Sequence, residues 1–249
     1  MLNVENDCMF KALACSITII MKDFKDVLAM DTIIQRSDEW FALRKNMLTA
    51  SDVASAIGVN PYSSRRQLLI NKVHPSNVRF DTEATRHGTF YEGVAIEKFA
   101  ALTGNVIHDI GIFVHPMYSW LGGSPDGITE QSVLIEVKCP LKRKIEHKIP
   151  DYYYPQVQTC MEILDIDMCH FIQFKPATDT CEEILDILDI PRDRPWFKNN
   201  LNIMHEFWKD VELYRADLTF PTSLYGIDPK KTIDLSDIHI SNYDFIEDT

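Results

Sequence analysis

The apolar run Val133–Val137 is the feature that most limits how this chain can fold, because it contains a carboxylate and is followed at once by an ammonium group. Its β-branched residues predict a strand, which Pro140 ends. Side chains two apart on a strand share a face, so Glu136 and Lys138 project together while Ile135 and Val137 face the other way. Charged side chains rarely occupy a buried strand without a partner or a ligand. The strand is therefore predicted to carry part of a functional site.

A second carboxylate, Asp126, lies upstream in the turn sequence Ser-Pro-Asp-Gly. A short turn over residues 130–132 would form a hairpin and bring Asp126 beside Glu136 and Lys138. Each half alone has an ordinary explanation, since Pro-Asp-Gly forms turns and Glu-x-Lys is common on solvated strand faces. Their combination favours a site in which two carboxylates hold a hard divalent cation and a lysine offsets phosphate charge.

Composition limits how such a chain could bind a phosphate-rich partner. Its 249 residues are 45% hydrophobic, which is enough for one sizeable α/β core. The net charge of −12 argues against a broad phosphate-binding surface. If DNA is bound, the contact is expected in a local channel that Arg65–Arg66 and Lys142–Lys144 could line, although solvated surface charge explains each cluster equally well. The run Tyr152–Tyr154 suits either packing or contact with DNA.

Cysteine and histidine spacing bears on metal class and compartment. The six cysteines lack Cys-x-x-Cys spacing and no histidines are spaced i, i+4, so neither zinc nor an iron–sulfur cluster is predicted. Free thiols indicate an intracellular protein. The apolar stretch at residues 17–21 is too short to span a bilayer, and no secretion signal is recognised. We therefore expect a protein that is neither secreted nor bound to membranes.

The chain divides into three predicted parts: a helical N-terminal extension over residues 1–34, a main domain over 35–218 and an acidic C-terminal tail over 219–249. Apolar residues with helical spacing run from Phe10 to Phe24 in the extension. Within the main domain, helices are expected after Ser37, from 49 or 51 to 57, around Glu92 and on to 102, and over 151–164 and 195–216. Strands are expected over 106–114, 120–129, 133–138, 170–174 and 183–190.

Three further sequence motifs precede the segments that contain Asp126 and Glu136, and one follows them. They are Trp-Phe-Ala-Leu-Arg at 40–44, Leu-Thr-Ala-Ser-Asp at 48–52, Gly-Thr-Phe-Tyr-Glu-Gly at 88–93 and Tyr-Pro-Gln-Val-Gln at 154–158. Together with Ser-Pro-Asp-Gly and Glu-Val-Lys-Cys-Pro, they resemble the phage λ exonuclease family of YqaJ-type viral recombinases, part of the PD-(D/E)xK nuclease superfamily. The resemblance runs from Ser37 to Lys175. It implies an α/β fold with a restriction-endonuclease-like core, in which helices flank a central mixed β-sheet.

The resemblance also implies a metal site. Asp126 and Glu136 would be direct ligands, assisted by the backbone carbonyl of Val137, and Glu92 would be a third acidic residue. The implied ion is Mg²⁺, which prefers oxygen ligands and for which Mn²⁺ would substitute. Periodicity alone makes Glu92 a solvated carboxylate in the first turn of a helix, stabilised by the helix dipole.

Further residues match the family's pattern. Lys138 would position or deprotonate a water and offset phosphate charge, and Gln158 would orient the lysine or a water. An exposed polar position on a helix is the ordinary alternative for Gln158. Arg44 and Ser51 match residues that hold the 5′-terminal phosphate in this family, although Ser51 also suits a helix N-cap.

The implied activity is that of a metal-dependent 5′→3′ exonuclease on double-stranded DNA ends. It would release nucleoside 5′-monophosphates and leave 3′ single-stranded overhangs for recombination or repair. The resemblance further implies a homotrimer ring, a single-strand annealing partner and a phage or viral source. A structure-selective or site-specific endonuclease on the same core, and a non-catalytic DNA-end binding module, are the alternatives.

Overall fold

Two β-sheets form the framework of the computed structural model, which describes residues 23–30, 33–75 and 82–216. The smaller sheet has the order β1 (Leu48–Thr49), β4 (Leu121–Gly123), β3 (Phe113–Val114). The larger has the order β2 (Ile107–His108), β5 (Gly127–Thr129), β6 (Leu134–Lys138), β7 (Met168–Lys175), β8 (Ile184–Pro191). Strand β6 is parallel to β7 and antiparallel to β5, so the predicted mixed sheet is confirmed.

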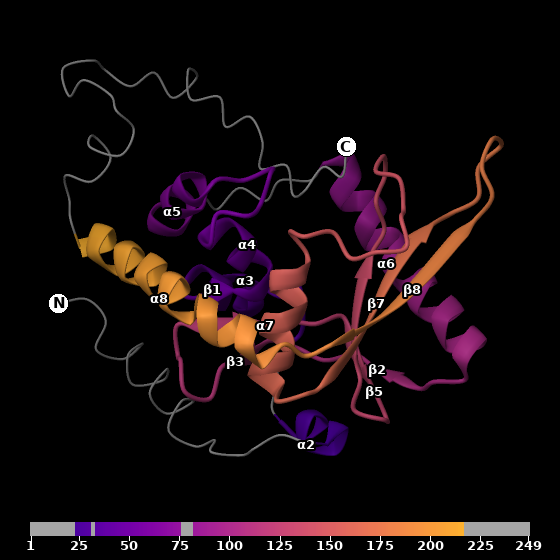
Figure 1. The fold of residues 1–249 in the computed structure, drawn as a ribbon, viewed down its shortest axis with the longest axis horizontal. Coiled ribbons are helices and arrows are strands. Elements are labelled where there is room, and N and C mark those ends of the chain that lie inside the picture. The colour runs from indigo at the N-terminus through magenta and orange to yellow at the C-terminus, as the bar shows by residue number, and fades with distance from the viewer. Residues whose placement is uncertain (1–22, 31–32, 76–81, 217–249) are drawn as a thin grey trace.

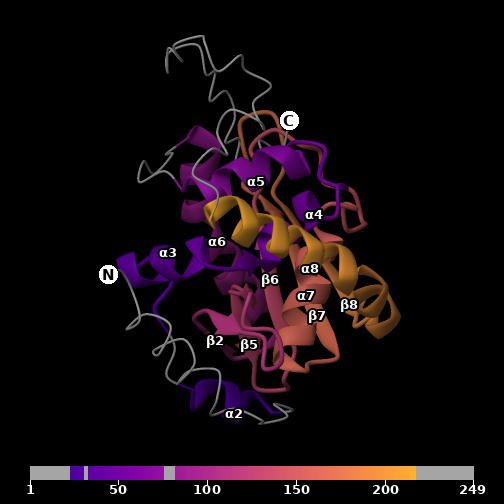
Figure 2. The same ribbon diagram turned by 90° about the vertical axis from the view of Figure 1, so that its left-hand side faces the viewer.

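Helices cover both faces of the larger sheet (Figure 1). The helical elements of the described residues are α2 (Phe24–Leu28), α3 (Asp38–Lys45), the 3-10 turn η1 (Ala50–Asp52), α4 (Val53–Ala56), α5 (Arg65–Val73), α6 (Glu83–Thr103), α7 (Tyr154–Leu164) and α8 (Arg194–Ala216). Helices α5 and α8 lie side by side in both views, and both contact α4 (Figures 1 and 2). No described helix is long and apolar enough to cross a membrane.

Alternation along β6 divides the core into two clusters. Leu134 packs with Phe171 and residues of α7 and α8. Ile135 and Val137 pack on the opposite face with Phe99 of α6. The prediction that these two residues face away from the charged pair is confirmed, because Glu136 and Lys138 share the face of Leu134, toward α7.

The acidic turn marks a crossing between the two sheets. The strand predicted over 120–129 is interrupted at residues 124–126, so that β4 belongs to the smaller sheet and β5 to the larger one. The strand predicted over 106–114 is divided in the same way, into β2 and β3. Pro125 has no backbone N–H to donate to a ladder, which suits a position where the chain leaves one sheet for another. Asp126 therefore stands at the junction of the two sheets.

Helix ends differ from the sequence predictions in two informative places. Ser37 caps α3, as predicted, and Gly104, at a φ of 73°, ends α6. Helix α6 begins at Glu83, so Glu92 lies in mid-helix and its expected place in the first turn is wrong. Ser51 is also no N-cap, because it lies inside η1 and the α4 helix starts only after Asp52.

Two predicted segments fall largely outside the described residues. In the N-terminal extension these residues include 23–30, which contain α2, whereas the apolar positions from Phe10 to Ile20 lie outside them. The acidic tail over 219–249 lies outside them entirely. The proposed boundaries at 34 and 218 remain predictions.

Glycine substitutions test the close packing beneath the crossing. A Cβ on Gly123 would lie 3.1 Å from Cys160 Sγ, 3.1 Å from Ile163 Cδ1 and 3.2 Å from Ala50 Cβ. Gly123→Ala should therefore lower the free energy of unfolding by about 1–3 kcal/mol. The matched change Gly88→Ala, in α6 with nothing within 4 Å, should raise it by about 0.5–1 kcal/mol. Urea unfolding measures both, and a stabilising Gly123→Ala would contradict the packing.

Candidate active site

Asp126 is held against the edge of β6 by backbone hydrogen bonds. Its N–H donates to Ile135 O at 3.1 Å, and its Oδ2 accepts from Val137 N at 2.7 Å. Gln35 anchors the preceding residue, because its Nε2 donates to Pro125 O at 2.8 Å. The hairpin predicted from the sequence thus places this carboxylate beside the strand that carries Glu136.

Glu136 is almost completely buried, with 2% of its side chain exposed. Its Oε1 accepts from Lys138 Nζ at 2.6 Å and from Gln156 Nε2 of α7 at 2.5 Å. Its Oε2 is buried and has no hydrogen-bond partner among the described residues. A buried carboxylate oxygen without a partner is costly, so this atom is a natural position for a cation or a water.

Burial raises the pKa of both acidic groups. For Asp126 burial is the largest cause, and the nearby charges of Glu136 and Glu92 raise the pKa further. For Glu136 burial again dominates, while the adjacent Lys138 opposes it. Two carboxyl groups that disfavour ionisation side by side form a site that a positive charge would stabilise.

These residues fit a hard divalent cation. The donors are carboxylate oxygens, one of them without a partner, and no sulfur or imidazole ligand is needed. The N–H and C=O of one strand residue point to the same edge, so the carbonyl of Val137 faces the same side as Asp126. Across the described ranges, no three His, Cys, Asp or Glu side chains are grouped closely enough to hold a metal ion. A cation between Asp126 and Glu136 would therefore require the carbonyl and water as additional ligands.

Glu92 lies near this pair but is bound elsewhere. Its Oε2 forms an ion pair with Arg36 Nη2 at 2.7 Å. Arg36 adopts a left-handed φ of 66°, which is uncommon for a residue with a side chain. Glu92 is close enough to raise the pKa of Asp126, yet Arg36 holds one of its oxygens. The predicted third acidic residue is thus in the neighbourhood of the site without joining a cluster of three carboxylates.

The structure does not bring Gln158 to the carboxylates. Gln158 is 1% exposed, its Nε2 donates to Pro191 O at 3.0 Å and its Oε1 accepts from Asp193 N at 2.6 Å. It therefore links α7 to the junction of β8 and α8, and neither predicted role describes it. Gln156, which the sequence analysis did not select, is instead the glutamine of α7 that reaches the carboxylates, where it donates to Glu136. The Gln-x-Gln spacing was an available signal, but it did not distinguish the two residues.

Arg44 and Ser51 are brought together as predicted. Arg44 Nη2 donates to Ser51 Oγ at 2.9 Å, and the guanidinium carbon lies 4.2 Å from the centre of the Trp40 ring. Trp40 in turn donates from Nε1 to Ser124 Oγ at 3.2 Å, beside the acidic turn. Burial lowers the pKa of Arg44, although Asp52 and more weakly Glu136 oppose this. The guanidinium is thus fixed on an aromatic ring within electrostatic reach of the buried carboxylate.

Lys72 is a neighbouring charged residue that the sequence analysis missed. It is 8% exposed, and its Nζ lies 2.8 Å from Asp52 Oδ2 and 3.0 Å from Arg44 O. Burial lowers the pKa of Lys72. Burial alone would raise the pKa of Asp52, but Lys72 and Arg44 hold it below its ordinary value. A lysine within the apolar stretch of α5 was the only signal for this pair in the sequence.

Comparison with known proteins agrees with this arrangement. Residues 39–167, just over half of the chain, match the YqaJ-like viral recombinase domain. The chain belongs to this family. Protein D345L of African swine fever virus (strain Badajoz 1971 Vero-adapted) is 34% identical over 164 residues, which cover 53% of this chain and 47% of D345L. The matched region thus spans about half the length of that viral relative.

Solved structures share the fold of this YqaJ-family chain. An alkaline exonuclease from Laribacter hongkongensis, LHK-Exo, matches with a TM-score of 0.63 and 25% identity, covering 75% of this chain and 98% of that protein. The same exonuclease in complex with dAMP also has a TM-score of 0.63, covering 72% of this chain and 94% of that one. A phage-related exonuclease from Haemophilus somnus 129PT has a TM-score of 0.52 at 16% identity, covering 71% and 96%, and shares the fold alone.

Removal of one buried charge should change stability in a pH-dependent way. Because burial raises the pKa of Asp126 in the folded state, the unfolded chain ionises it first, and stability falls as pH rises above the ordinary carboxyl pKa of about 3.9. In chelator at pH near 8, the free energy of unfolding of Asp126→Asn should therefore exceed that of the native chain by about 1–3 kcal/mol. The gain should vanish at pH near 4.

Chemical denaturation across that pH range measures the effect. The matched control is Asp109→Asn, since Asp109 is exposed. A loss of stability in Asp126→Asn at the higher pH, with no loss in the control, would show that the Asp126 carboxylate is favourably ionised in the folded protein.

Proposed function

We propose that this protein is a metal-dependent 5′→3′ exonuclease that degrades the 5′-phosphorylated strand of linear double-stranded DNA. The products would be nucleoside 5′-monophosphates and 3′ single-stranded overhangs for recombination or repair. The observation that carries the proposal is the placement of the Arg44–Ser51 pair within electrostatic reach of the buried Glu136. Family membership and the similarity to LHK-Exo support it, and dAMP, found with LHK-Exo, is a product of the proposed kind.

Each residue of the site would have a separate role in hydrolysis. A divalent ion held by Asp126, Glu136 and the carbonyl of Val137 would supply Lewis acidity toward the phosphate and activate a water. The ion is expected to be Mg²⁺, with Mn²⁺ as a substitute. Lys138, held on the face of Glu136, would position the attacking water and offset negative charge that develops on the phosphate. Gln156 would fix the orientation of the Glu136 carboxylate through its amide.

Recognition of the strand end would belong to Arg44 and Ser51. A guanidinium stacked on Trp40 and bonded to a hydroxyl is preorganised to donate to a terminal phosphate. Because burial lowers the pKa of Arg44, a phosphate dianion would restore a favourable environment for its charge. An endonuclease on the same core would need no such pair, which is why we favour the exonuclease.

Assembly and partners follow from the family resemblance. We include in the proposal a homotrimer ring around DNA and a single-strand annealing protein that receives the overhang. A ring would also compensate for the acidic surface of the chain, since three copies could enclose DNA without a broad basic face on each. Light scattering tests this part, because a strict monomer at working concentrations would exclude the ring.

One linear duplex tests the proposed activity. With Mg²⁺ the chain should degrade a strand with a 5′-phosphate about tenfold faster than one with a 5′-hydroxyl, and chelator should stop both. Arg44→Gln should remove that preference, whereas Lys138→Ala should slow cleavage of both strands by about 10² or more. Denaturing gels of 3′-labelled strands measure the rates.

Other results point to the alternatives. Nicking of covalently closed circular duplex would replace the exonuclease with the endonuclease. Binding of duplex ends without any cleavage in Mg²⁺ or Mn²⁺ would favour the non-catalytic end-binding module.

The two glutamines of α7 form a matched pair. Gln156→Leu should slow DNA cleavage by about tenfold or more with little change in stability, because it removes a bond to Glu136 at the site. Gln158→Leu should lower the free energy of unfolding by about 2–4 kcal/mol, because it strands Asp193 N and Pro191 O. Cleavage rates and urea unfolding are measured on both variants. A reversal of the two effects would restore Gln158 as the residue that acts at the carboxylates.

A further inference from the structure

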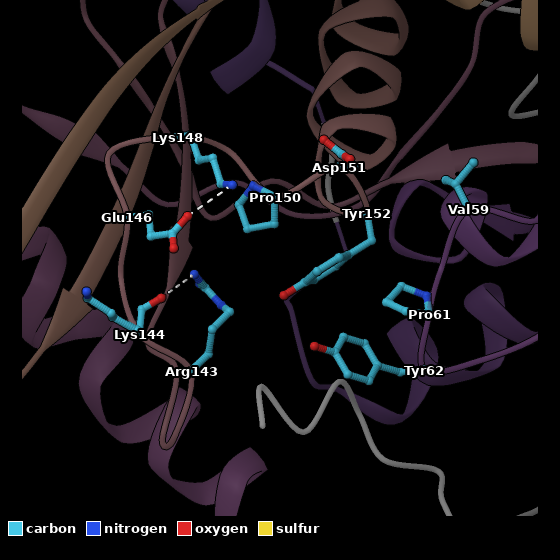
Figure 3. A pocket seen from close by; sticks show the side chains of 10 residues that line it. All are labelled: Val59, Pro61, Tyr62, Arg143, Lys144, Glu146, Lys148, Pro150, Asp151 and Tyr152. Carbon is cyan, nitrogen blue, oxygen red and sulfur yellow. Dashed lines mark hydrogen bonds and ion pairs between the residues drawn. The ribbon is translucent and has the colours of Figure 1, made fainter.

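A pocket with a volume of about 530 Å³ lies next to the candidate active site, between the loop after α4 and the loop after β6. We name it the tyrosine pocket, and define it by Tyr62, Arg143, Lys144, Glu146, Lys148 and Tyr152 (Figure 3). Its volume falls within the range of small-ligand sites. None of these residues takes part in the hydrolysis described above.

Two tyrosines form an aromatic wall on one side of the pocket. The rings of Tyr62 and Tyr152 are 5.3 Å apart and nearly perpendicular, at 89°. Figure 3 shows both hydroxyls pointing across the hollow toward Arg143. A ring face and two hydroxyl groups directed at a guanidinium offer stacking and hydrogen bonds to one flat polar ligand.

Arg143 is held in place by a buried residue. Its Nη2 donates to Gln173 Oε1 at 2.9 Å, and Gln173, which is 0% exposed, also donates to Glu146 O at 2.9 Å and Lys148 O at 3.3 Å. One buried amide thus fixes the guanidinium and the backbone of the loop that carries it. Such preorganisation lowers the entropic cost of binding a ligand.

The tyrosine pocket is linked to the candidate active site through Tyr153. Gln173 is the register partner of Lys138 in the β6–β7 ladder. Lys138 Nζ lies 5.0 Å and Arg143 Cζ 5.9 Å from the centre of the same ring, that of Tyr153. Tyr153 in turn packs on Tyr152 of the pocket wall, with ring centres 4.5 Å apart. A strand held by Lys138 would therefore find Arg143 as its next cation.

Charges in the pocket favour a nucleotide over a broad polyanion. Glu146 forms an ion pair with Lys148 at 3.0 Å, and Asp151 also lines the hollow. Lys144 directs its ammonium away from the hollow in Figure 3. Arg143 is thus the main cation facing the ligand, which suits one phosphate with its base stacked on a tyrosine. The charged residues of the pocket do not provide the many phosphate contacts that a duplex needs.

We propose that the tyrosine pocket binds a nucleotide of single-stranded DNA, on the strand that continues from the phosphate at the candidate active site. The base would stack on Tyr62 or Tyr152 and the phosphate would bond to Arg143. The continuity with the strand under hydrolysis rests on the proposed function, whereas the binding of a single strand does not.

Binding is measured by fluorescence anisotropy of a labelled oligothymidylate of about 12 nucleotides, with the full chain in chelator. Arg143→Gln and Tyr62→Leu should each weaken binding by about tenfold. Glu146→Gln should instead tighten it by a few-fold at low salt, because it removes a carboxylate from the lining and releases Lys148. Glu97→Gln is the matched control, since Glu97 is exposed on α6. The core contacts of α6 lie on the face of the larger sheet that points away from α7.

The tightening by Glu146→Gln separates binding from a merely structural role, which would not increase affinity. Unchanged affinity in both Arg143→Gln and Tyr62→Leu would overturn the proposal. So would equal tightening by Glu97→Gln and Glu146→Gln, which would reveal only a general charge effect. Oligouridylate that binds as tightly and loses affinity in the same variants would overturn the assignment to DNA.

Failure of the proposed function leaves a different pattern. A chain that cleaves no DNA, yet loses oligothymidylate binding in Arg143→Gln and Tyr62→Leu, would retain the pocket and lose the exonuclease. A chain that degrades 5′-phosphorylated strands while both variants bind normally would retain the exonuclease and lose the pocket.

Discussion

Burial of negative charge beside β6 is the constraint on which the rest of the structure depends. Two carboxyl groups share one corner of the core: a backbone N–H of β6 holds Asp126, and a lysine of β6 and a glutamine of α7 hold Glu136. The charges of these carboxyl groups also affect other buried groups. Burial raises the pKa of the Cys160 thiol, and Glu136 and Asp126 raise it further. Tight packing of the surrounding core offsets this cost, and a bound cation would reduce it.

Positive charge is supplied locally in a chain that is acidic as a whole. Arg44 and Lys72 are both withdrawn from water, which lowers the pKa of each, and Asp52 compensates for them. Lys138 and Arg143 add two further cations, which both lie beside the Tyr153 ring. Because these cations are partly desolvated, an anion that reaches them interacts more strongly than it would with solvated surface lysines. Local positive charge of this kind would reconcile the proposed nucleic-acid chemistry with a net charge of −12.

Much of this arrangement could be predicted from the sequence. Alternation along β6 was sufficient to place Glu136 and Lys138 on one face, and the Ser-Pro-Asp-Gly turn placed Asp126 beside them. The sequence did not reveal that two predicted strands cross between sheets, because local propensity is continuous through each of them. Helix α5 was missed because its short apolar stretch is flanked by polar residues and its apolar face is defined only by contact with α4 and α8. Gln156 and Gln158 could not be told apart, because the direction in which each points depends on how α7 is rotated about its axis.

That rotation has a consequence for how the family can vary. Residues two apart on a helix point about 200° away from each other, so α7 directs one amide to the buried carboxylate and the other to the start of α8. Both hydrogen bonds require the same rotation of α7 about its axis. A single residue inserted or deleted between Gln156 and Gln158 would turn one of them by about 100° relative to the other and break at least one bond. The exposed loop between β7 and β8 carries no such requirement. Changes in chain length among relatives should therefore accumulate in that loop and be absent from α7.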